Sequence, residues 1–240
     1  MQVLLLRLDA PLMSFGGVMV DQHGPIERFP GLSMLTGLCG NALGYKHEHA
    51  AALESLQARI HYAARWDVEP EELRDYQTVD LGQPKMAEHG WTTRGEPEHR
   101  TGGPSAIQGI HQRFRHYWAN GVMTVALILT GTCTPDIFTL AAAFQFPARP
   151  LFLGRKTCLP AAPLFLKIVE AHSPLSALRQ LPSASRSGHV SIKRMAACWH
   201  EAITDGESEH GQPIYDHRDW YNQVHAGRRI RFEGWVEVDP

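Results

Sequence analysis

The order of strand-like and helical segments over residues 2–170 constrains the fold of this chain most. Short apolar runs indicate buried strands, one segment alternates apolar and polar side chains as a half-buried strand does, and two segments repeat apolar residues at helical spacing. The order is strand, helix, strand, strand, helix, strand, which is the split βαβ pattern of RNA-binding modules. It predicts an α+β, ferredoxin-like (RRM-like) fold. The segments are 3–8, 32–44, 59–68, 122–129, 135–144 and 164–169.

The rest of the chain carries weaker β signals. Ser173-Pro174 is typical of the N-cap and first position of a helix, which we expect to end near Leu181. Later strands are predicted on both sides of a polar loop, at 189–200 and 229–238. We therefore predict a ferredoxin-like domain over residues 1–171 and a small β-rich C-terminal extension over residues 172–240.

Composition describes a globular chain that is long enough to bury a core. Hydrophobic residues make up 43% of the 240 positions and charged residues 20%, which excludes a disordered protein. No apolar run approaches the roughly 20 residues needed to cross a bilayer, so no membrane partner is expected. The first residues indicate a strand and not a signal peptide, and the four cysteines lack CxxC spacing. We expect reduced thiols and a cytoplasmic location.

The net charge of −2 conceals a strong asymmetry along the chain. Residues 99–200 contain only two acids, Asp136 and Glu170, against eleven cations, so this span carries +9 and the remainder −11. Such segregation favours a polyanion as the ligand, although charges that are distant in sequence also interleave on folding. The cations are Arg100, Arg113, Arg115, Arg149, Arg155, Lys156, Lys167, Arg179, Arg186, Lys193 and Arg194.

Residues 147–167 hold a glycine next to two of these cations. Phe152-Leu153-Gly154-Arg155-Lys156 lies between prolines, so the segment is predicted as a tight turn and not a helix. Gly154 permits the close approach of another backbone or of a ligand, and exposed backbone donors beside fixed cations suit phosphate oxygens. An ordinary connecting turn with two solvated cations is the alternative.

Residues 81–120 have no sustained period, and a structureless loop of this length is uncommon unless it is functional. The second half lacks acids and ends in cations interleaved with aromatic residues, Arg113-Phe114-Arg115-His116-Tyr117-Trp118. This composition suits single-stranded nucleic acid, whose phosphates meet cations while its bases stack on rings. A hairpin anchored by its aromatic residues on the protein's own core is the alternative. Residues 73–79 are predicted to be a strand beside 59–68.

No motif in the chain predicts a metal, a cofactor or an established catalytic set. His47 and His49 lack further ligands at a metal spacing, and the turn at Gly154 lacks the first glycine of a nucleotide-binding P-loop. His210 and His217 are predicted to lie in a polar loop with Asp216 and Asp219. A metal-independent endoribonuclease remains an alternative, in which His111 or His116 would deprotonate a 2′-hydroxyl and Tyr117 would assist the leaving group or the charge of the transition state.

Several segments together resemble the Cas five family, subtype I-E, of CRISPR Cascade surveillance complexes. The matching segments lie along nearly the whole chain: LLLRLDAPLMSFGG, RFPGLSMLTGLCGNALGY, LRDYQTV, RPLFLGRKTCLPAAPLF and RDWY. The resemblance implies a RAMP fold with a glycine-rich loop and a projecting β-hairpin thumb. It also implies that the chain is a non-catalytic subunit that holds the 5′ handle of CRISPR RNA (crRNA) and caps the complex in antiviral DNA targeting.

The same resemblance implies partners and site residues. The partners would be crRNA, the backbone subunit CasC and the large subunit CasA, with target DNA reached indirectly through the complex. The thumb would come from residues 82–120, where the match is poorest. Phosphates would be bound by the cations of the site, and bases would be supported by Phe15, Tyr76 and Phe152. The predicted RNA-binding residues are Ser14, Phe15, Gly16, Arg28, Ser33, Thr36, Tyr76, Arg113, Arg115, Phe152, Gly154, Arg155 and Lys156.

Overall fold

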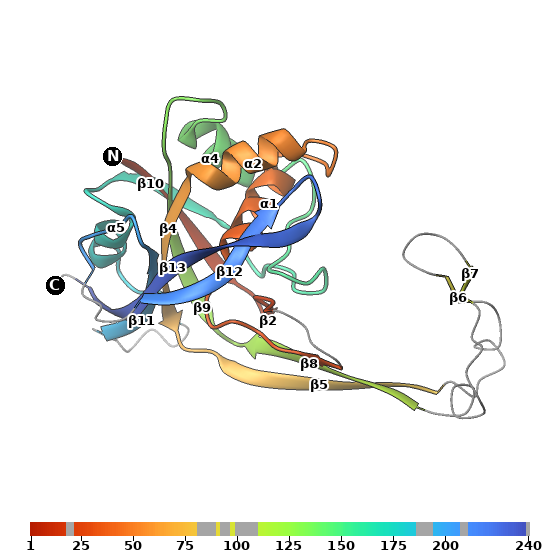
Figure 1. Ribbon diagram of the computed structural model, residues 1–240. Coiled ribbons are helices and arrows are strands. Elements are labelled where there is room, and N and C mark those ends of the chain that lie inside the picture. The colour runs from red at the N-terminus through yellow and green to blue at the C-terminus, as the bar shows by residue number, and fades with distance from the viewer. Residues whose placement is uncertain are drawn as a thin grey trace.

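A seven-stranded antiparallel sheet forms the body of the protein (Figure 1). The computed structural model describes residues 1–17, 22–80, 90–91, 97–98, 110–185, 194–206 and 211–238. The strand order is β10-β1-β9-β4-β11-β13-β12, so the predicted strands 3–8 and 122–129 lie side by side at the centre of the first four. The strands are β1 (Gln2–Asp9), β4 (Ile60–Val68), β9 (Val122–Leu129), β10 (Phe165–Glu170), β11 (Arg194–His200), β12 (Gly211–Asp219) and β13 (Val224–Glu237).

Helices cover both faces of this sheet, because β1 places apolar side chains alternately on the two faces. Leu4 and Leu6 belong to the larger core, which includes side chains of α1 (Leu32–Leu43), α2 (Ala50–Arg59) and α4 (Ile137–Gln145). Val3 and Leu5 point to a second core, which is closed by α5 (Pro174–Gln180). Successive side chains of a strand face opposite sides of a sheet, so a strand that is apolar throughout requires cover on both.

Strand β4 corrects the expectation of a half-buried strand over 59–68. Arg65 and Asp67 are 0% and 2% exposed, because α5 covers the face from which they project. Arg65 Nε donates to Asp67 Oδ1 at 2.7 Å, Nη2 donates to the Leu181 carbonyl at 2.7 Å, and Nη1 donates to the Leu178 carbonyl. The buried charges are therefore paired, and the carbonyls at the end of α5 accept the remaining guanidinium protons.

A long two-stranded arm extends from the body (Figure 1). Its strands, β5 (Glu71–Asp80) and β8 (Ile110–Ala119), pair over ten residues, and β8 also pairs with β2 (Leu12–Met13) and β3 (His23–Gly24). The prediction that 73–79 lies beside 59–68 is wrong, since β4 pairs with β9 and β11. Two short strands, β6 (Gly90–Trp91) and β7 (Pro97–Glu98), pair with each other; the rest of the segment 81–109 lies outside the described residues.

The later strands extend the main sheet. β11 pairs with β4, and β13 pairs with both β11 and β12. Part of the expected polar loop between the later strands is β12, which corrects that prediction; the predicted start of β11 at 189–193 and residue His210 lie outside the described residues. Ser173 caps α5 with a full capping box, as its sequence indicates. None of the described helices has the length and apolar character to cross a membrane.

Candidate functional site: a basic groove

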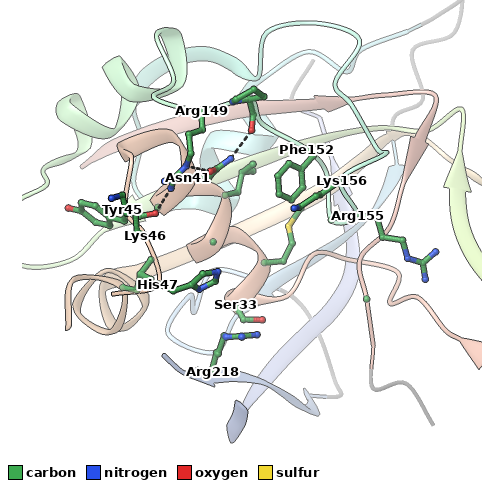
Figure 2. Close-up of a pocket in the computed structure, with 18 of the residues that line it drawn as sticks. Ser33, Asn41, Tyr45, Lys46, His47, Arg149, Phe152, Arg155, Lys156 and Arg218 are labelled. Carbon is green, nitrogen blue, oxygen red and sulfur yellow. Dashed lines mark hydrogen bonds between the residues drawn. The ribbon is translucent and has the colours of Figure 1, made fainter. Parts of the chain in front are cut away.

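A groove of about 930 Å³ lies between α1, the loop that follows α4 and the end of β12 (Figure 2). We call it the basic groove because five of its lining residues are Lys or Arg and, among the residues that the structure describes, none of its lining side chains is acidic. It contains seven of the predicted site residues: Ser14, Gly16, Ser33, Phe152, Gly154, Arg155 and Lys156. Its cations are Lys46, Arg149, Arg155, Lys156 and Arg218, accompanied by His47.

Gly154 is the position at which the loop approaches the body most closely. Its φ is +93°, and a Cβ atom placed on it would lie 1.7 Å from the carbonyl oxygen of Ser14. The Ser14 N–H donates to the Leu153 carbonyl at 3.0 Å, while the Cys158 N–H closes the turn on the Arg155 carbonyl at 2.9 Å. The predicted close approach is confirmed, and the approaching group is the protein's own backbone.

Arg155 joins the loop to the base of the arm. Its guanidinium donates to the carbonyls of His116 (3.1 Å) and Gly24 (3.4 Å) and lies 4.7 Å from the centre of the Tyr117 ring. In Figure 2 its side chain points away from Phe152 and Lys156. Arg155 is thus half-buried and partly committed to the fold, which the sequence did not indicate.

Lys156 and Phe152 are the freer members of the loop. Lys156 is exposed, and the structure gives its ammonium no carboxylate partner among the described residues, so its charge is available to a ligand. Phe152 is half-buried and lines the same groove as Lys156. A cation and a partly exposed ring in one groove combine the two contacts that single-stranded nucleic acid uses, phosphate pairing and base stacking.

Asn41 of α1 fixes the opposite end of the same loop. Its Oδ1 accepts from Arg149 Nε at 2.6 Å, and its Nδ2 donates to the Pro150 carbonyl at 2.8 Å (Figure 2). Arg149 also donates to the carbonyl of Tyr45. Arg149 therefore contributes positive charge to the groove while it holds the loop against α1.

Side chains from strands of the sheet hold the start of α1 in place. Asp216 of β12 accepts the Leu32 N–H at 2.6 Å and pairs with Arg229 at 2.8 Å. Tyr62 donates its hydroxyl to the Pro30 carbonyl at 2.6 Å and accepts from Arg229. Burial raises the pKa of Tyr62, so the hydroxyl keeps the proton that it donates. The described residues, Asp216 and His217 included, form no group of three His, Cys, Asp or Glu side chains that could hold a metal ion.

Two predicted residues are core residues. Phe15 is 1% exposed and packs near Trp66, with ring centres 6.1 Å apart. Thr36 is 0% exposed, and its hydroxyl donates to the Leu32 carbonyl one turn earlier. The expectation that the Phe15 ring supports a base is corrected, because the ring is buried in the larger core. Ser14 borders the groove, but its hydroxyl is buried.

Four predicted residues lie outside the groove. Arg28 pairs with Glu69. Tyr76, Arg113 and Arg115 are on the arm; Tyr76 is 52% exposed and stacks on Phe114 at 5.0 Å. They share the arm with Asp75 and Glu72, so the arm is less basic than its second strand alone suggests.

Two of the residues proposed for cleavage, His116 and Tyr117, do not converge. His116 and Tyr117 are neighbours on β8, so their side chains face opposite sides of the arm. His116 Nδ1 lies 2.5 Å from Glu72 Oε1, whereas Tyr117 is buried beneath Arg155. The side chain of His111 lies outside the described residues. This arrangement gives no shared acid–base pair to His116 and Tyr117.

Sequence reasoning missed four residues of the groove that bear on an anion: Lys46, Arg149, Arg218 and Trp220. Arg149 was counted in the basic span, and RDWY was among the resembling segments, so a signal existed for three of them. Lys46 had no signal, because it stands beside Glu48, to which its ammonium lies at 3.5 Å.

Comparison with known proteins identifies the family. The statistical model of a family described as CRISPR-associated protein (Cas_Cas5) matches residues 3–232, nearly the whole chain. The chain belongs to the Cas5 family. The resemblance inferred from the sequence is thereby confirmed at the level of the family.

A relative and two solved structures agree with this assignment. The chain is 33% identical over 183 residues to the CRISPR system Cascade subunit CasD of Escherichia coli (strain K12). The aligned part covers 73% of this chain and 75% of the relative. A chain of a CRISPR RNA-guided surveillance complex aligns with a TM-score of 0.70 at 21% identity, over 98% of this chain and 90% of that one. A chain from a crystal structure of a Cas protein aligns with a TM-score of 0.64 at 20% identity, over 98% and 95%. These two structures support the fold of the Cas5-family chain.

Proposed function

We propose that this chain is a Cascade subunit that binds the 5′ handle of crRNA in the basic groove and caps one end of the complex. The observation that carries the proposal is the groove itself, with five cations, partly exposed Phe152 and no acid among its described lining residues. Cations neutralise phosphates and release their counterions, which supplies most of the affinity for a nucleic acid. The relative named as a Cascade subunit gives the RNA its biological context.

The fold supports the finer assignment. The strand order β10-β1-β9-β4, with α1 and α2 between β1 and β4 and α4 between β9 and β10, supports the proposal of a ferredoxin-like RAMP domain. We propose that the β5–β8 arm, which extends from the body, is the thumb (Figure 1). CasC and CasA are the proposed neighbours, and target DNA is contacted only through the assembled complex.

Binding of the 5′ part of a crRNA to the full chain tests the proposal. Lys156→Gln removes one exposed charge and should lower affinity while reducing the slope of log K against log salt by about 0.7, the value for one phosphate contact on a single strand. Lys167→Gln is the matched control, because Lys167 is exposed on β10 outside the groove. Equal affinities and slopes for wild type, Lys156→Gln and Lys167→Gln would refute the groove as the RNA site.

We further propose that the chain does not cleave RNA. The pairing of His116 with Glu72 is the one observation that favours the alternative endoribonuclease, since a carboxylate can orient an imidazole as a base. Incubating the protein with repeat RNA in EDTA distinguishes the two functions. Defined products that disappear in His116→Ala would overturn the non-catalytic assignment.

A further inference from the structure

The far end of the basic groove is formed by the last residues of β12 and the residue that follows it. Arg218 and Trp220 line the groove there. In Figure 2, Arg218 lies across from the loop that carries Phe152 and Lys156. The Arg218 guanidinium lies 5.2 Å from the centre of the Trp220 ring, and Trp220 is held in a small core with Ala50 and Leu53. A cation stacked on a fixed indole forms a rigid platform.

Both side chains keep donors that the protein does not satisfy. Arg218 uses Nη2 on the backbone and side-chain oxygens of Gln223, at 3.2 and 2.9 Å. Arg218 Nε and Trp220 Nε1 are buried and lack an acceptor in the part of the chain that the structure describes, although Trp220 is only 6% exposed. Arg218 itself is half-buried and lines the groove, and its Nη1 has no acceptor among the described residues, so this nitrogen can donate to a ligand.

The floor of this end contains a glycine that the fold does not require. Gly37 lies inside α1, where glycine disfavours a helix relative to alanine. A Cβ atom on Gly37 would meet only Trp220 Cη2, at an ordinary 3.7 Å, whereas on Gly40 it would lie 2.6 Å from Leu53 Cδ2. Packing therefore explains Gly40 and not Gly37, and Gly37 leaves open the space that a ligand on α1 would occupy.

We propose that Gly37, Arg218 and Trp220 form a second nucleotide subsite, with a base lying over Gly37 and a phosphate or base oxygen bound by Arg218. The inference rests on the proposed RNA-binding function and extends it, because it gives the strand a path along α1. One phosphate lies near Lys156 and another lies near Arg218. A groove of about 930 Å³ is large enough for this, since pockets for small ligands span roughly 300–1,000 Å³.

A ladder of 3′-labelled oligoribonucleotides, lengthened one nucleotide at a time, tests the path on the full chain. Arg218→Gln should weaken binding on the order of tenfold once the strand is long enough to reach the second subsite. The salt slope for those longer strands should fall by about 0.7. Gly37→Ala should weaken the same strands while the melting temperature stays equal to or above that of wild type.

The outcomes separate this subsite from the proposed function. If Lys156→Gln weakens RNA binding while Arg218→Gln and Gly37→Ala bind strands of every length as wild type does, the second subsite is refuted and RNA binding in the groove stands. If none of the three variants changes affinity, both are refuted. Arg218 also contacts Gln223, so Arg218→Gln could disturb that turn as well as the subsite. Gly37→Ala removes no such contact, so it tests the subsite without this structural effect.

Discussion

Replacing Gly154 by alanine should destabilise the protein more than its exposure suggests. Its φ of +93° costs an L-residue roughly 1–2 kcal/mol. The new Cβ would lie 1.7 Å from the Ser14 carbonyl oxygen, and real Cβ contacts stay beyond 3.0 Å, so one segment must move. That movement breaks the 3.0 Å hydrogen bond from Ser14 to Leu153. The lost bond contributes roughly 0.5–1.5 kcal/mol and the overpacking roughly 1–3 kcal/mol, so with the backbone term the expected loss is about 2.5–6.5 kcal/mol.

Thermal unfolding followed by circular dichroism measures this loss. A change of 1 kcal/mol shifts the melting temperature of a chain of this size by roughly 2–4 °C, so Gly154→Ala should melt roughly 5–26 °C lower. Gly131→Ala is the matched control, because Gly131 has a φ of +75° but no atom within 4 Å of its Cβ position. It should lose only the conformational part, about 1–2 kcal/mol. Equal losses in the two variants would refute the reasoning that the close approach to Ser14 fixes this loop.

Three further predictions concern the body of the protein. Asp67→Ala leaves the charge of Arg65 buried and unpaired, so it should lower the free energy of unfolding, measured by urea denaturation, by about 3–5 kcal/mol. The double variant Arg65→Met with Asp67→Leu should lower it less, and a larger loss in the double variant would contradict this reasoning. Ser173→Ala removes the oxygen that accepts the Ser176 N–H at 2.9 Å and should cost about 1–2 kcal/mol by the same assay, while no change would show that the cap is dispensable. His200, which stacks on His61 at 4.4 Å, has its pKa lowered from 6.5 to about 4, first by burial and then by the charges of His61 and Arg229. Between these two pH values the unfolded chain binds a proton that the folded chain does not, so the stability of the fold falls as the pH falls from about 6.5 to about 4. Melting curves should show a smaller fall in stability for His200→Gln than for wild type. An identical fall in the two proteins would exclude His200 as the cause.

The sequence predicted those elements whose signals are local. The apolar runs of β1 and β9, the period of α1 and the Ser173-Pro174 cap each depend on neighbouring residues, and each was confirmed. The burial of Arg65 was not predicted, because its acceptors, the carbonyls of Leu178 and Leu181, are more than 100 positions away in the sequence. A charged residue in an alternating segment predicts exposure unless distant partners are known.

The candidate site divides in the same way. The glycine and cations of residues 152–156 were found because they are contiguous, whereas Arg218 and Trp220 reach the groove only through the pairing of β12 with β13. β12 itself was missed because its largely exposed residues, which include Gly211 and Pro213, show no clear alternation. Phe15 was assigned to a site from its place in a resembling segment, but position in sequence does not reveal on which side of the chain a ring is packed.

Arg155 has a consequence for how variants of this protein are interpreted. One guanidinium fastens three stretches of chain, at Gly24, His116 and the glycine turn, where the arm leaves the body. Replacing Arg155 removes the hydrogen bonds that connect these stretches and also removes a positive charge. Weaker RNA binding by an Arg155 variant could therefore result from either change. Lys156, one residue further and without such duties among the described residues, reports on charge alone.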